Sequence, residues 1–421
     1  MIRTSSTANG SSSRHEALRV GIVADFLEER WPSMDLVVAM LARELPRVSG
    51  ALPLEAKVLR PSFLSPLSAI NRSKNSRYAY NAERALNRYL RYPLWLRRER
   101  NRFDVFHVVD HSYAHLVNYL PAERTIVTCH DLDVFRPLLE SGGDSRSMIL
   151  RAIAAHVRNG MRRASIVTCD TVATRDTLLK SGICSDAKSV VIHNGVDAEM
   201  LAAGVEAEKT AVEILGPPSA DRIEILHVGL VNQRKRIDVA LKVFAGVCRD
   251  FPDARLIRAG GPLDDELAEL AASLAIRDRI ITLPFVGRKV LGAIYRRAAL
   301  LLVTSEAEGF GLPVIEGLAC GTPVVASDIP ALREVGGSAA EYCPVGDVER
   351  WRESATAILR ERANAAAALE KRRADGIAWS AQFSWREYAG RMANLYHAVS
   401  EAAARAPLER LDPLSVIKEI E

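Results

Sequence analysis

The chain has 421 residues, enough for two or three domains at roughly 150 residues each, so a single small module is excluded. Apolar residues make up 48% and charged residues 26%, which is the composition of a folded globular protein and excludes a disordered chain. The 56 Lys and Arg against 52 Asp and Glu leave a formal net charge of only +4, so no overall positive field indicates nucleic-acid binding.

The apolar runs, such as 298–303 and 322–326, are far shorter than the roughly 18 residues that cross a bilayer, so we expect no transmembrane helix. Residues 1–17 are rich in Ser and Thr and lack the apolar core of a secretory signal, which predicts a disordered leader and a cytoplasmic protein. The six cysteines show no CxxC spacing, so free thiols and no metal site are expected.

Strands and helices alternate from Leu18 onward. A β-rich run over 18–25 is followed by a loop and by an amphipathic helical pattern at positions 36, 40, 41 and 45. Further β-rich runs follow at 105–109, 124–129, 165–169 and 189–192. Because strands that alternate with helices form parallel, doubly wound sheets, we predict a first α/β domain over 18–200.

A second series of strands predicts a second α/β domain over 221–378. Its runs lie at 222–229, 255–259, 280–283, 300–304 and 323–327. The segment before it has weak apolar periodicity and ends in Gly-Pro-Pro, so residues 201–220 are predicted as the interdomain connection. An aromatic-rich final helix is predicted over 379–405, followed by a loose tail over 406–421.

The segment 70–103 is strongly basic. It holds ten Arg and Lys residues against two Glu, and tyrosines and a tryptophan lie between the charges. This composition is typical of an amphipathic helix on anionic lipid or of a site for an anionic acceptor. The alternative is a solvated surface helix with a few aromatic side chains turned to the core.

The glycine-containing stretch 305–323 follows a strand and opens a helix predicted over 312–320. Pro313 suits the first helical turn and Gly321 suits the position just past the helix end. Gly309 and Gly311 permit close approach of the backbone, so the amides from Gly309 to Leu312 are expected to point at a phosphate near the positive helix end.

Two carboxylates flank these glycines. Glu308 lies on the loop and Glu316 is predicted on the first helical turn, so both are expected to border one cleft. A carboxylate repels phosphate but accepts both O–H groups of a vicinal diol, which a ribose or a donor sugar supplies. The alternative is that these acidic groups only complement the helix dipole.

A basic loop over 227–236 ends the first strand of the second domain, where open α/β sheets bind ligands. After Gly229 it carries Arg234, Lys235 and Arg236, which can neutralise a leaving diphosphate without a metal. The alternative is an ordinary solvated loop.

Two strands of the first domain each end in an adjacent aspartate and histidine. These pairs are Asp110-His111 and His130-Asp131, and both are expected to face the cleft. The alternative is that they are loop or capping residues.

The run 308–327, together with Arg234-Lys235, His130-Asp131 and the stretch 192–197, resembles the GT-B glycosyltransferases of family GT4. The resemblance spans most of 18–398. It implies an α/β fold of two Rossmann-like, doubly wound domains that face an interdomain cleft. It also implies a nucleotide sugar held mainly by the C-terminal domain and a final helix that crosses back to the N-terminal one.

The resemblance implies a hexosyltransferase that retains anomeric configuration and uses a nucleoside-diphosphate sugar, with no metal and no other cofactor. Glu316 would bind the ribose hydroxyls, and Lys235 with Arg234 the diphosphate. His130 would lie at the sugar and acceptor side, with Asp131, Asp110 and His111 beside it. The donor would further contact Glu308, Gly229, Gly309, Phe310, Gly311 and Leu312, and the loop at Lys289 would read the base.

The partners implied are this donor and a glycan, lipid-linked or small-molecule acceptor, with peripheral contact to the inner face of a membrane through 70–103. Two features depart from the family: Leu230 stands where many members have Arg, so Arg234 is expected to supply that charge, and residues 28–35 replace the usual glycine-rich loop.

Other functions remain open at this stage. They are a nucleotide-sugar epimerase or hydrolase of the same fold, and a non-catalytic subunit that binds a sugar nucleotide. A nicotinamide-dependent dehydrogenase is disfavoured, because the run 20–26 lacks GxGxxG.

Overall fold

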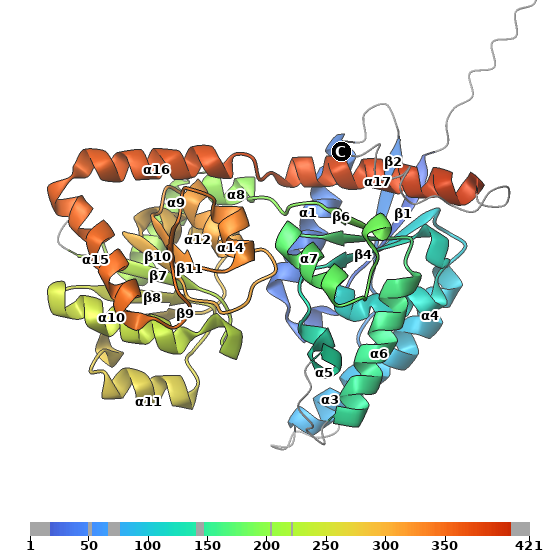
Figure 1. Ribbon diagram of the computed structural model, residues 1–421, viewed down its shortest axis with the longest axis horizontal. Coiled ribbons are helices and arrows are strands. Elements are labelled where there is room, and N and C mark those ends of the chain that lie inside the picture. The colour runs from blue at the N-terminus through green and yellow to red at the C-terminus, as the bar shows by residue number, and fades with distance from the viewer. Residues whose placement is uncertain are drawn as a thin grey trace, which may run out of the picture.

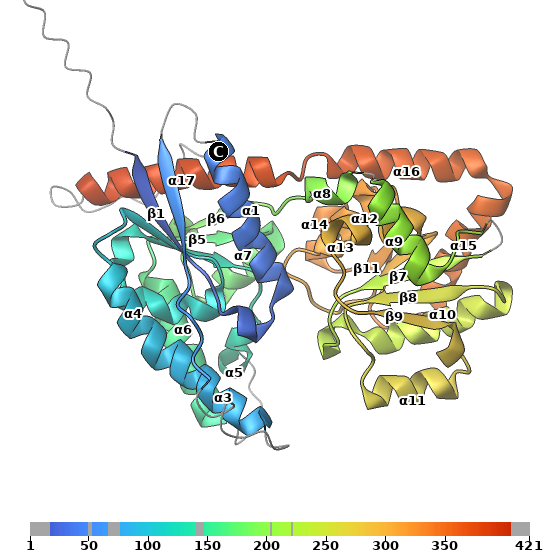
Figure 2. The same ribbon diagram turned by 180° about the vertical axis from the view of Figure 1, so that it is seen from behind.

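The computed structural model describes residues 17–48, 53–65, 76–139, 147–202, 204–219 and 222–405. Nearly all of the predicted leader, the whole predicted tail 406–421 and positions 70–75 of the basic segment lie outside the described residues. Within the described chain, two six-stranded parallel sheets form two α/β halves that lie side by side (Figures 1 and 2). The predicted fold class, two Rossmann-like domains, is confirmed.

The first sheet has the strand order β2-β1-β3-β4-β5-β6. Its strands are β1 (Leu18–Val23), β2 (Leu54–Leu59), β3 (Val105–Val108), β4 (Thr125–Cys129), β5 (Ile166–Cys169) and β6 (Ser189–Val191). The helices and helical turns of this half are η1 (Leu27–Glu29), α1 (Pro32–Val48), α3 (Ser76–Leu86), the π-helical turn η2 (Asn87–Arg91), α4 (Tyr92–Glu99), η3 (His111–Tyr119), η4 (Ala122–Arg124), η5 (Asp133–Phe135), α5 (Arg136–Leu139), α6 (Ser147–Arg163), α7 (Val172–Lys180) and η6 (Asp186–Lys188).

The second sheet has the order β12-β11-β10-β7-β8-β9. Its strands are β7 (Glu224–Val228), β8 (Arg255–Ala259), β9 (Ile280–Leu283), β10 (Leu300–Val303), β11 (Val324–Ser327) and β12 (Glu341–Cys343). The helices of this half are α8 (Ala198–Leu201), α9 (Val205–Leu215), η7 (Gln233–Lys235), α10 (Ile237–Asp250), α11 (Asp265–Ser273), η8 (Arg277–Arg279), α12 (Arg288–Arg297), α13 (Leu312–Ala319), α14 (Pro330–Gly336), α15 (Val348–Asn364) and α16 (Ala366–Ser380), and α17 (Trp385–Arg405) follows them.

Each sheet is buried on both faces, as parallel sheets require. In β1, Val20 and Ile22 pack with α1 and α17, whereas Val23 faces the opposite core with Tyr92. In β8, Leu256 and Ile257 likewise enter different cores. The strands therefore have apolar side chains on both faces, and polar side chains collect at the strand ends.

The chain crosses between the two halves earlier than the sequence indicates. The segment 201–220 was predicted as the connection, but it contains α9, which buries Ala207, Ala211 and Leu215 in the C-terminal core. The sequence showed only a weak apolar periodicity here, because two of the three buried residues of α9 are alanines. The crossing lies at 192–197, directly after β6.

The return crossing lies beside the first one. Val196 forms a parallel bridge with Ser384, and a Cβ on Gly195 would lie 2.0 Å from the backbone nitrogen of Trp385. Glycine is therefore required at 195 by close approach of the two backbones. The two crossings form one compact junction between the halves.

The predicted final helix 379–405 is two helices. Both views show α16 along the C-terminal half and α17 along the N-terminal half (Figures 1 and 2). Trp379 and Phe383 pack in the C-terminal core, whereas Trp385, Tyr388 and Tyr396 pack in the N-terminal core. The aromatic residues thus secure both ends of the return crossing.

No helix among the described residues has the length and apolar character needed to cross a membrane.

Candidate active site

The loop between β7 and α10 carries the predicted cations. The Oδ1 of Asn232 accepts the backbone N–H of Arg234 at 3.1 Å and so starts the turn η7. The hydroxyl of Thr304, just after β10, lies 3.0 Å from the carbonyl oxygens of both Lys235 and Arg236. These bonds fasten the basic loop at the point between β7 and β10 where the strand order reverses, which is where α/β sheets bind ligands.

The cations of this loop are paired with carboxylates, which residue spacing alone did not predict. Lys235 Nζ lies 2.5 Å from Glu308 Oε1, and Ser305 Oγ donates to the same oxygen at 2.7 Å. Arg236 Nε donates to Asp238 Oδ1 at 3.0 Å. The structure thus places these two predicted residues side by side, and their role at a donor stays a prediction.

Arg234 reaches across to the N-terminal half. Its Nη1 donates to Asp131 Oδ2 and to Asp133 Oδ2, each at 2.8 Å. Burial alone would raise the pKa of Asp131, but contacts with His111 and Arg234 hold it far below its usual range. Arg234 was predicted to take the charge of a diphosphate. In the structure its guanidinium contacts carboxylates of the opposite half, and its role at a diphosphate stays a prediction.

The glycine loop is wedged between the halves. The carbonyl oxygen of Gly309 accepts hydrogen bonds from Thr171 Oγ1 at 2.8 Å and Thr174 Oγ1 at 3.0 Å, both at the start of α7. A Cβ at position 309 would lie 1.5 Å from the carbonyl oxygen of His130. Gly311 has φ +100°, a left-handed conformation that also favours glycine.

The helix after this loop begins at Leu312, as predicted, and ends at Ala319, one residue early. Phe310 is buried and packs edge-on against Phe383, with ring centroids 5.9 Å apart. Among the described residues, no carbonyl accepts the N–H groups of residues 309–312. These amides stay available for an anion at the positive end of α13.

Glu316 lies one turn further into α13 than predicted, as the fifth residue of the helix. It is 3% exposed. Its Oε1 accepts from Arg288 Nη2 at 2.5 Å and its Oε2 from the Tyr295 hydroxyl at 3.0 Å, and both partners belong to α12. Each carboxylate oxygen has a second lone pair, so two acceptor positions remain for a diol.

The remaining predicted donor residues are placed as follows. Gly229 follows β7 with φ +150°, and a Cβ there would lie 3.4 Å from Lys235 Cε. Lys289 is exposed near the start of α12, and its neighbour Arg288 makes the contact with Glu316.

His130 is buried with both ring nitrogens engaged. Nδ1 lies 2.6 Å from Asp170 Oδ2, and Nε2 lies 2.8 Å from the carbonyl oxygen of Val109. Burial opposes a charge on this ring, but the carboxylate of Asp170 outweighs it and raises the pKa of His130 to about 9. His130 is therefore a fixed imidazolium that donates twice inside the protein. What it presents to the glycine loop is its backbone carbonyl.

The other acceptor-side residues surround His130. His111 Nδ1 accepts the backbone N–H of His130 at 3.4 Å, and His111 Nε2 lies 3.4 Å from Asp131 Oδ1. Asp110 accepts from the backbone N–H and the hydroxyl of Ser112 at 2.8 and 2.6 Å. The structure thus brings the two predicted pairs together, with Asp110 as the cap of η3.

Comparison with known families agrees with this geometry. Residues 216–375 match the family described as Glycosyl transferases group 1, and residues 36–200 match Glycosyltransferase Family 4. The chain belongs to the family 4, group 1 glycosyltransferases.

Curated relatives support this family assignment, and solved structures share the fold. The chain is 30% identical over 305 residues to a D-inositol 3-phosphate glycosyltransferase of Mycobacterium avium, covering 69% of each protein. The similar enzyme of Mycolicibacterium smegmatis is 29% identical over 74% of this chain and 72% of that protein. The fold matches sucrose-phosphate synthase from Thermosynechococcus elongatus with TM-score 0.65 and 19% identity over 91% of this chain and 100% of that one. It matches Anabaena Alr3699/HepE in complex with UDP and glucose with TM-score 0.67 and 16% identity over 90% and 100%.

Several site residues of this glycosyltransferase were missed by the sequence analysis. Asp170 and Thr171 follow a strand end, as His130-Asp131 do, and that parallel could have indicated them. No sequence pattern around Glu334 indicated that it belongs to the site. It accepts the N–H groups of Val172 and Ala173 at 2.8 and 3.1 Å and contacts His193 Nε2 at 2.8 Å.

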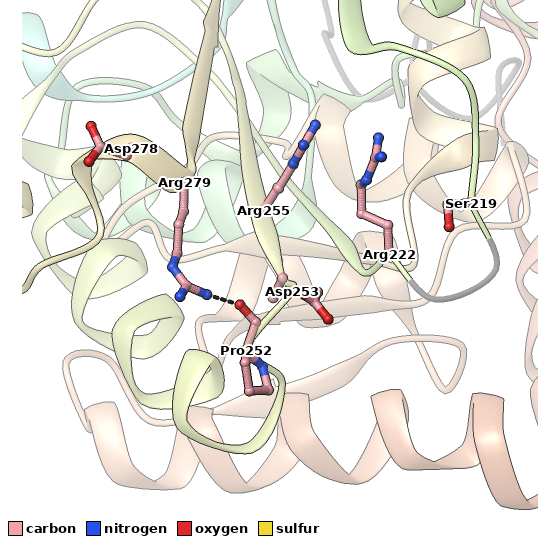
Figure 3. A pocket seen from close by; sticks show the side chains of 8 residues that line it. Ser219, Arg222, Pro252, Asp253, Arg255, Asp278 and Arg279 are labelled. Carbon is pink, nitrogen blue, oxygen red and sulfur yellow. Dashed lines mark hydrogen bonds between the residues drawn. The ribbon is translucent and has the colours of Figure 1, made fainter.

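A separate cavity of about 440 Å³ lies at the opposite, amino ends of β7, β8 and β9 (Figure 3). Arg222 and Arg255 both line it, and Arg279 donates to the carbonyl oxygen of Pro252 (Figure 3). None of the predicted site residues lines this cavity. The residues that line it are Ser219, Arg222, Pro252, Asp253, Ala254, Arg255, Asp278 and Arg279.

Proposed function

We propose that this glycosyltransferase moves a sugar from a nucleoside-diphosphate sugar to an acceptor hydroxyl, with retention of anomeric configuration and without a divalent metal. One observation carries the proposal: the Lys235 and Glu308 pair, the glycine loop and the carbonyl of His130 meet where the two halves face each other. This is an arrangement for a ligand that combines a diphosphate with hydroxyl groups.

The proposed roles follow from charge. The free amides of residues 309–312 and the ammonium of Lys235 take the growing negative charge of the leaving diphosphate. Glu316 accepts the ribose hydroxyls, and Glu308, once Lys235 turns to the diphosphate, accepts hydroxyls of the sugar. The acceptor oxygen bonds to the anomeric carbon on the face from which the diphosphate leaves as the bond from that carbon to the diphosphate oxygen breaks, and the leaving diphosphate takes the hydroxyl proton, so no covalent intermediate is proposed.

The test is product analysis with purified protein, UDP-, GDP- and ADP-sugars and candidate acceptors. A phosphorylated polyol is the first small molecule to try, since similar proteins are named D-inositol 3-phosphate glycosyltransferases. Expected results are a product whose anomeric configuration equals that of the donor by NMR, and unchanged turnover in EDTA. An inverted product, or activity lost in EDTA and restored by Mn²⁺ or Mg²⁺, would contradict the proposed mechanism.

The same assay separates the alternatives. A nucleotide-sugar epimerase or hydrolase would convert the donor without an acceptor. A non-catalytic subunit would bind the nucleotide and turn over no donor until a partner is added.

We further propose that the N-terminal half contacts an anionic lipid surface. Leu86, Leu90 and Leu94 are about half exposed and lie four residues apart, so they form one row along α3, η2 and α4. Exposed Arg97 and Arg98 follow this row. An apolar row beside cations complements the surface of an anionic bilayer.

One basic residue of this segment is excluded from that role. Arg88 is buried, with Nη1 3.2 Å from Glu29 Oε2 and its guanidinium 4.0 Å from the ring centroid of Tyr113. Vesicle co-sedimentation should therefore compare wild type with Leu90→Gln/Leu94→Gln and with Arg97→Glu/Arg98→Glu. We expect binding to anionic vesicles that both variants weaken. Equal binding by all three proteins would contradict the lipid contact.

A further inference from the structure

Arg258 is a buried cation that lacks a carboxylate partner. It lies in β8, is 0% exposed, and is in register with His227 of β7. Within the described chain no carboxylate approaches its guanidinium to 4.0 Å, and its Nε and Nη2 have no hydrogen-bond partner. Its Nη1 donates to the carbonyl oxygen of Gly229 at 2.6 Å and more weakly to that of Ala259 at 3.3 Å.

A buried charge without a partner destabilises a folded protein, because it loses its hydration and gains little in return. Burial lowers the pKa of Arg258 to about 10, so the group still carries its proton at neutral pH. Burial and the nearby Arg258 also lower the pKa of His227 to about 3, so that ring is neutral. The positive charge of Arg258 is therefore not compensated locally.

The cations on the loop above Arg258, in contrast, are each paired with a carboxylate. Lys235 pairs with Glu308, Arg234 with two carboxylates of the N-terminal half, and Arg236 with Asp238. Leu230, which follows Gly229, adds no charge. Among these three cations and Arg258, only the charge of Arg258 is not compensated by a carboxylate.

The contact between Arg258 and Gly229 also sets the direction of the loop. The Gly229 N–H donates to the carbonyl oxygen of Ala259 at 2.9 Å, and a Cβ on Gly260 would lie 2.1 Å from the Gly229 oxygen. The carbonyl of Gly229 is therefore held against β8 by Arg258. A carbonyl oxygen turned the other way would present negative charge to a phosphate at the carboxyl end of the sheet.

We propose that Arg258 is a positioning residue for the leaving diphosphate. Its positive charge, beneath the loop, attracts the negative charge of a diphosphate. Its hydrogen bond keeps the Gly229 carbonyl turned away from that ligand. The inference rests on the proposed function, because it assumes that a diphosphate binds at this end of the sheet. It has a distinct consequence: the unliganded protein is less stable with Arg258 than with an apolar side chain of similar size.

The test measures thermal unfolding and the binding of inorganic pyrophosphate and of UDP, GDP and ADP. For Arg258→Met we expect a higher Tm without ligand and affinity for pyrophosphate about tenfold weaker or more, as one partly screened charge at short range provides. Arg258→Gln keeps a donor for Gly229 but no charge, so it should bind pyrophosphate more weakly than wild type and more tightly than Arg258→Met. Arg258→Lys, measured at pH 6 so that a buried ammonium keeps its proton, should recover most of the affinity.

Two arginines serve as matched controls. The side chain of Arg297 is only 9% exposed but is paired through two nitrogens with Glu224, so Arg297→Met should lower the Tm. Arg255 lies on the same strand as Arg258 but in the cavity at its other end, so Arg255→Met should leave pyrophosphate affinity unchanged (Figure 3). Loss of affinity in Arg255→Met, with none in Arg258→Met, would place the ligand in that cavity and overturn the proposal.

The remaining outcomes are equally decisive. Failure of Arg258→Met to fold, or a fall in Tm like that of Arg297→Met with unchanged affinity, would show that Arg258 is only structural. If wild type binds neither pyrophosphate nor any nucleotide, the proposed function itself fails. Equal binding by wild type and Arg258→Met contradicts only the role of Arg258.

Discussion

The carboxylate of Glu316 accepts two hydrogen bonds inside the protein, from Arg288 and Tyr295, before any nucleotide binds. Such bonds fix the rotamer of the carboxylate and leave its remaining lone pairs directed at one place. A preorganised acceptor pair of this kind binds a vicinal diol without the cost of ordering a free side chain.

Glu316→Gln should therefore weaken the affinity for the nucleotide that wild type binds by tenfold or more, on the order of 1.5–3 kcal/mol for a charge-assisted hydrogen bond. Calorimetry with UDP, GDP and ADP measures it. Tyr295→Phe is the comparison variant, because it removes one of the two internal bonds and keeps the carboxylate, so its affinity should fall less than that of Glu316→Gln. Unchanged affinity in Glu316→Gln would remove Glu316 from the site.

The buried pair of His130 and Asp170 makes stability depend on pH. The folded-state pKa of His130 is about 9, above its ordinary value of 6.5. A raised histidine pKa stabilises the fold fully below pH 6.5, and that contribution is lost as the pH rises toward 9. A difference of this size corresponds to about 3 kcal/mol.

Urea unfolding at pH 6.5 and at pH 9.5 should show this loss in wild type. Asp170→Asn removes the charge that raises the pKa, so most of the pH dependence should disappear in that variant. Asp25, whose pKa is raised to about 7 by burial and by neighbouring carboxylates, also ionises within this window, but it does so in both proteins, so the comparison with Asp170→Asn isolates the contribution of His130. If wild type and Asp170→Asn lose equal stability over the window, the pair is not the cause.

At the scale of elements, the junction between the halves depends on Gly195. Gly195→Ala places a methyl group against the backbone at Ser384 and Trp385, where nothing flexible can yield. The strained contact should cost about 1–3 kcal/mol and lower the Tm. Gly204→Ala is the matched control, since a Cβ there meets no atom within 4 Å. Equal Tm values for the two variants would mean that the crossings can separate freely.

Local chemistry explains which elements could be predicted. Helix α13 was placed to within one residue because Gly311, Pro313 and Gly321 mark its ends. The edge strands β2 and β12 were missed. β2 has charged side chains at Glu55 and Lys57 that an exposed edge tolerates, and β12 has only three residues. Helix α9 was missed because its buried face consists mainly of alanines.

The candidate site shows the corresponding limit for side chains. The strand ends and the glycine loop were located correctly, since parallel sheets bring their carboxyl ends together. The ion-pair partners of the charged residues could not be predicted, because residues such as Arg234 and Asp131 are 103 positions apart in the sequence and belong to different halves. Arg258 follows two apolar residues in β8, Leu256 and Ile257, and its lack of a carboxylate partner is a property of the packed core alone.

At the scale of the whole molecule, two neighbouring arginines divide their contacts between the halves. Arg234 binds Asp131 and Asp133 of the N-terminal half, whereas Arg236 binds Asp238 and Glu306 within the C-terminal half. Arg234 therefore opposes opening of the cleft. For partly exposed ion pairs the contribution is on the order of 1 kcal/mol, which changes an open-to-closed ratio about fivefold.

Removing each arginine separately tests this role. Arg234→Gln should increase the radius of gyration of the unliganded protein in small-angle X-ray scattering, because the open arrangement gains population. Arg236→Gln, which removes the same charge one position beyond Lys235, should leave the radius unchanged. The hydrogen bonds of Thr171 and Thr174 to Gly309 remain in both variants, so a partial shift is expected rather than complete opening. Identical scattering from the two variants would mean that the ion pairs across the cleft do not hold the halves together.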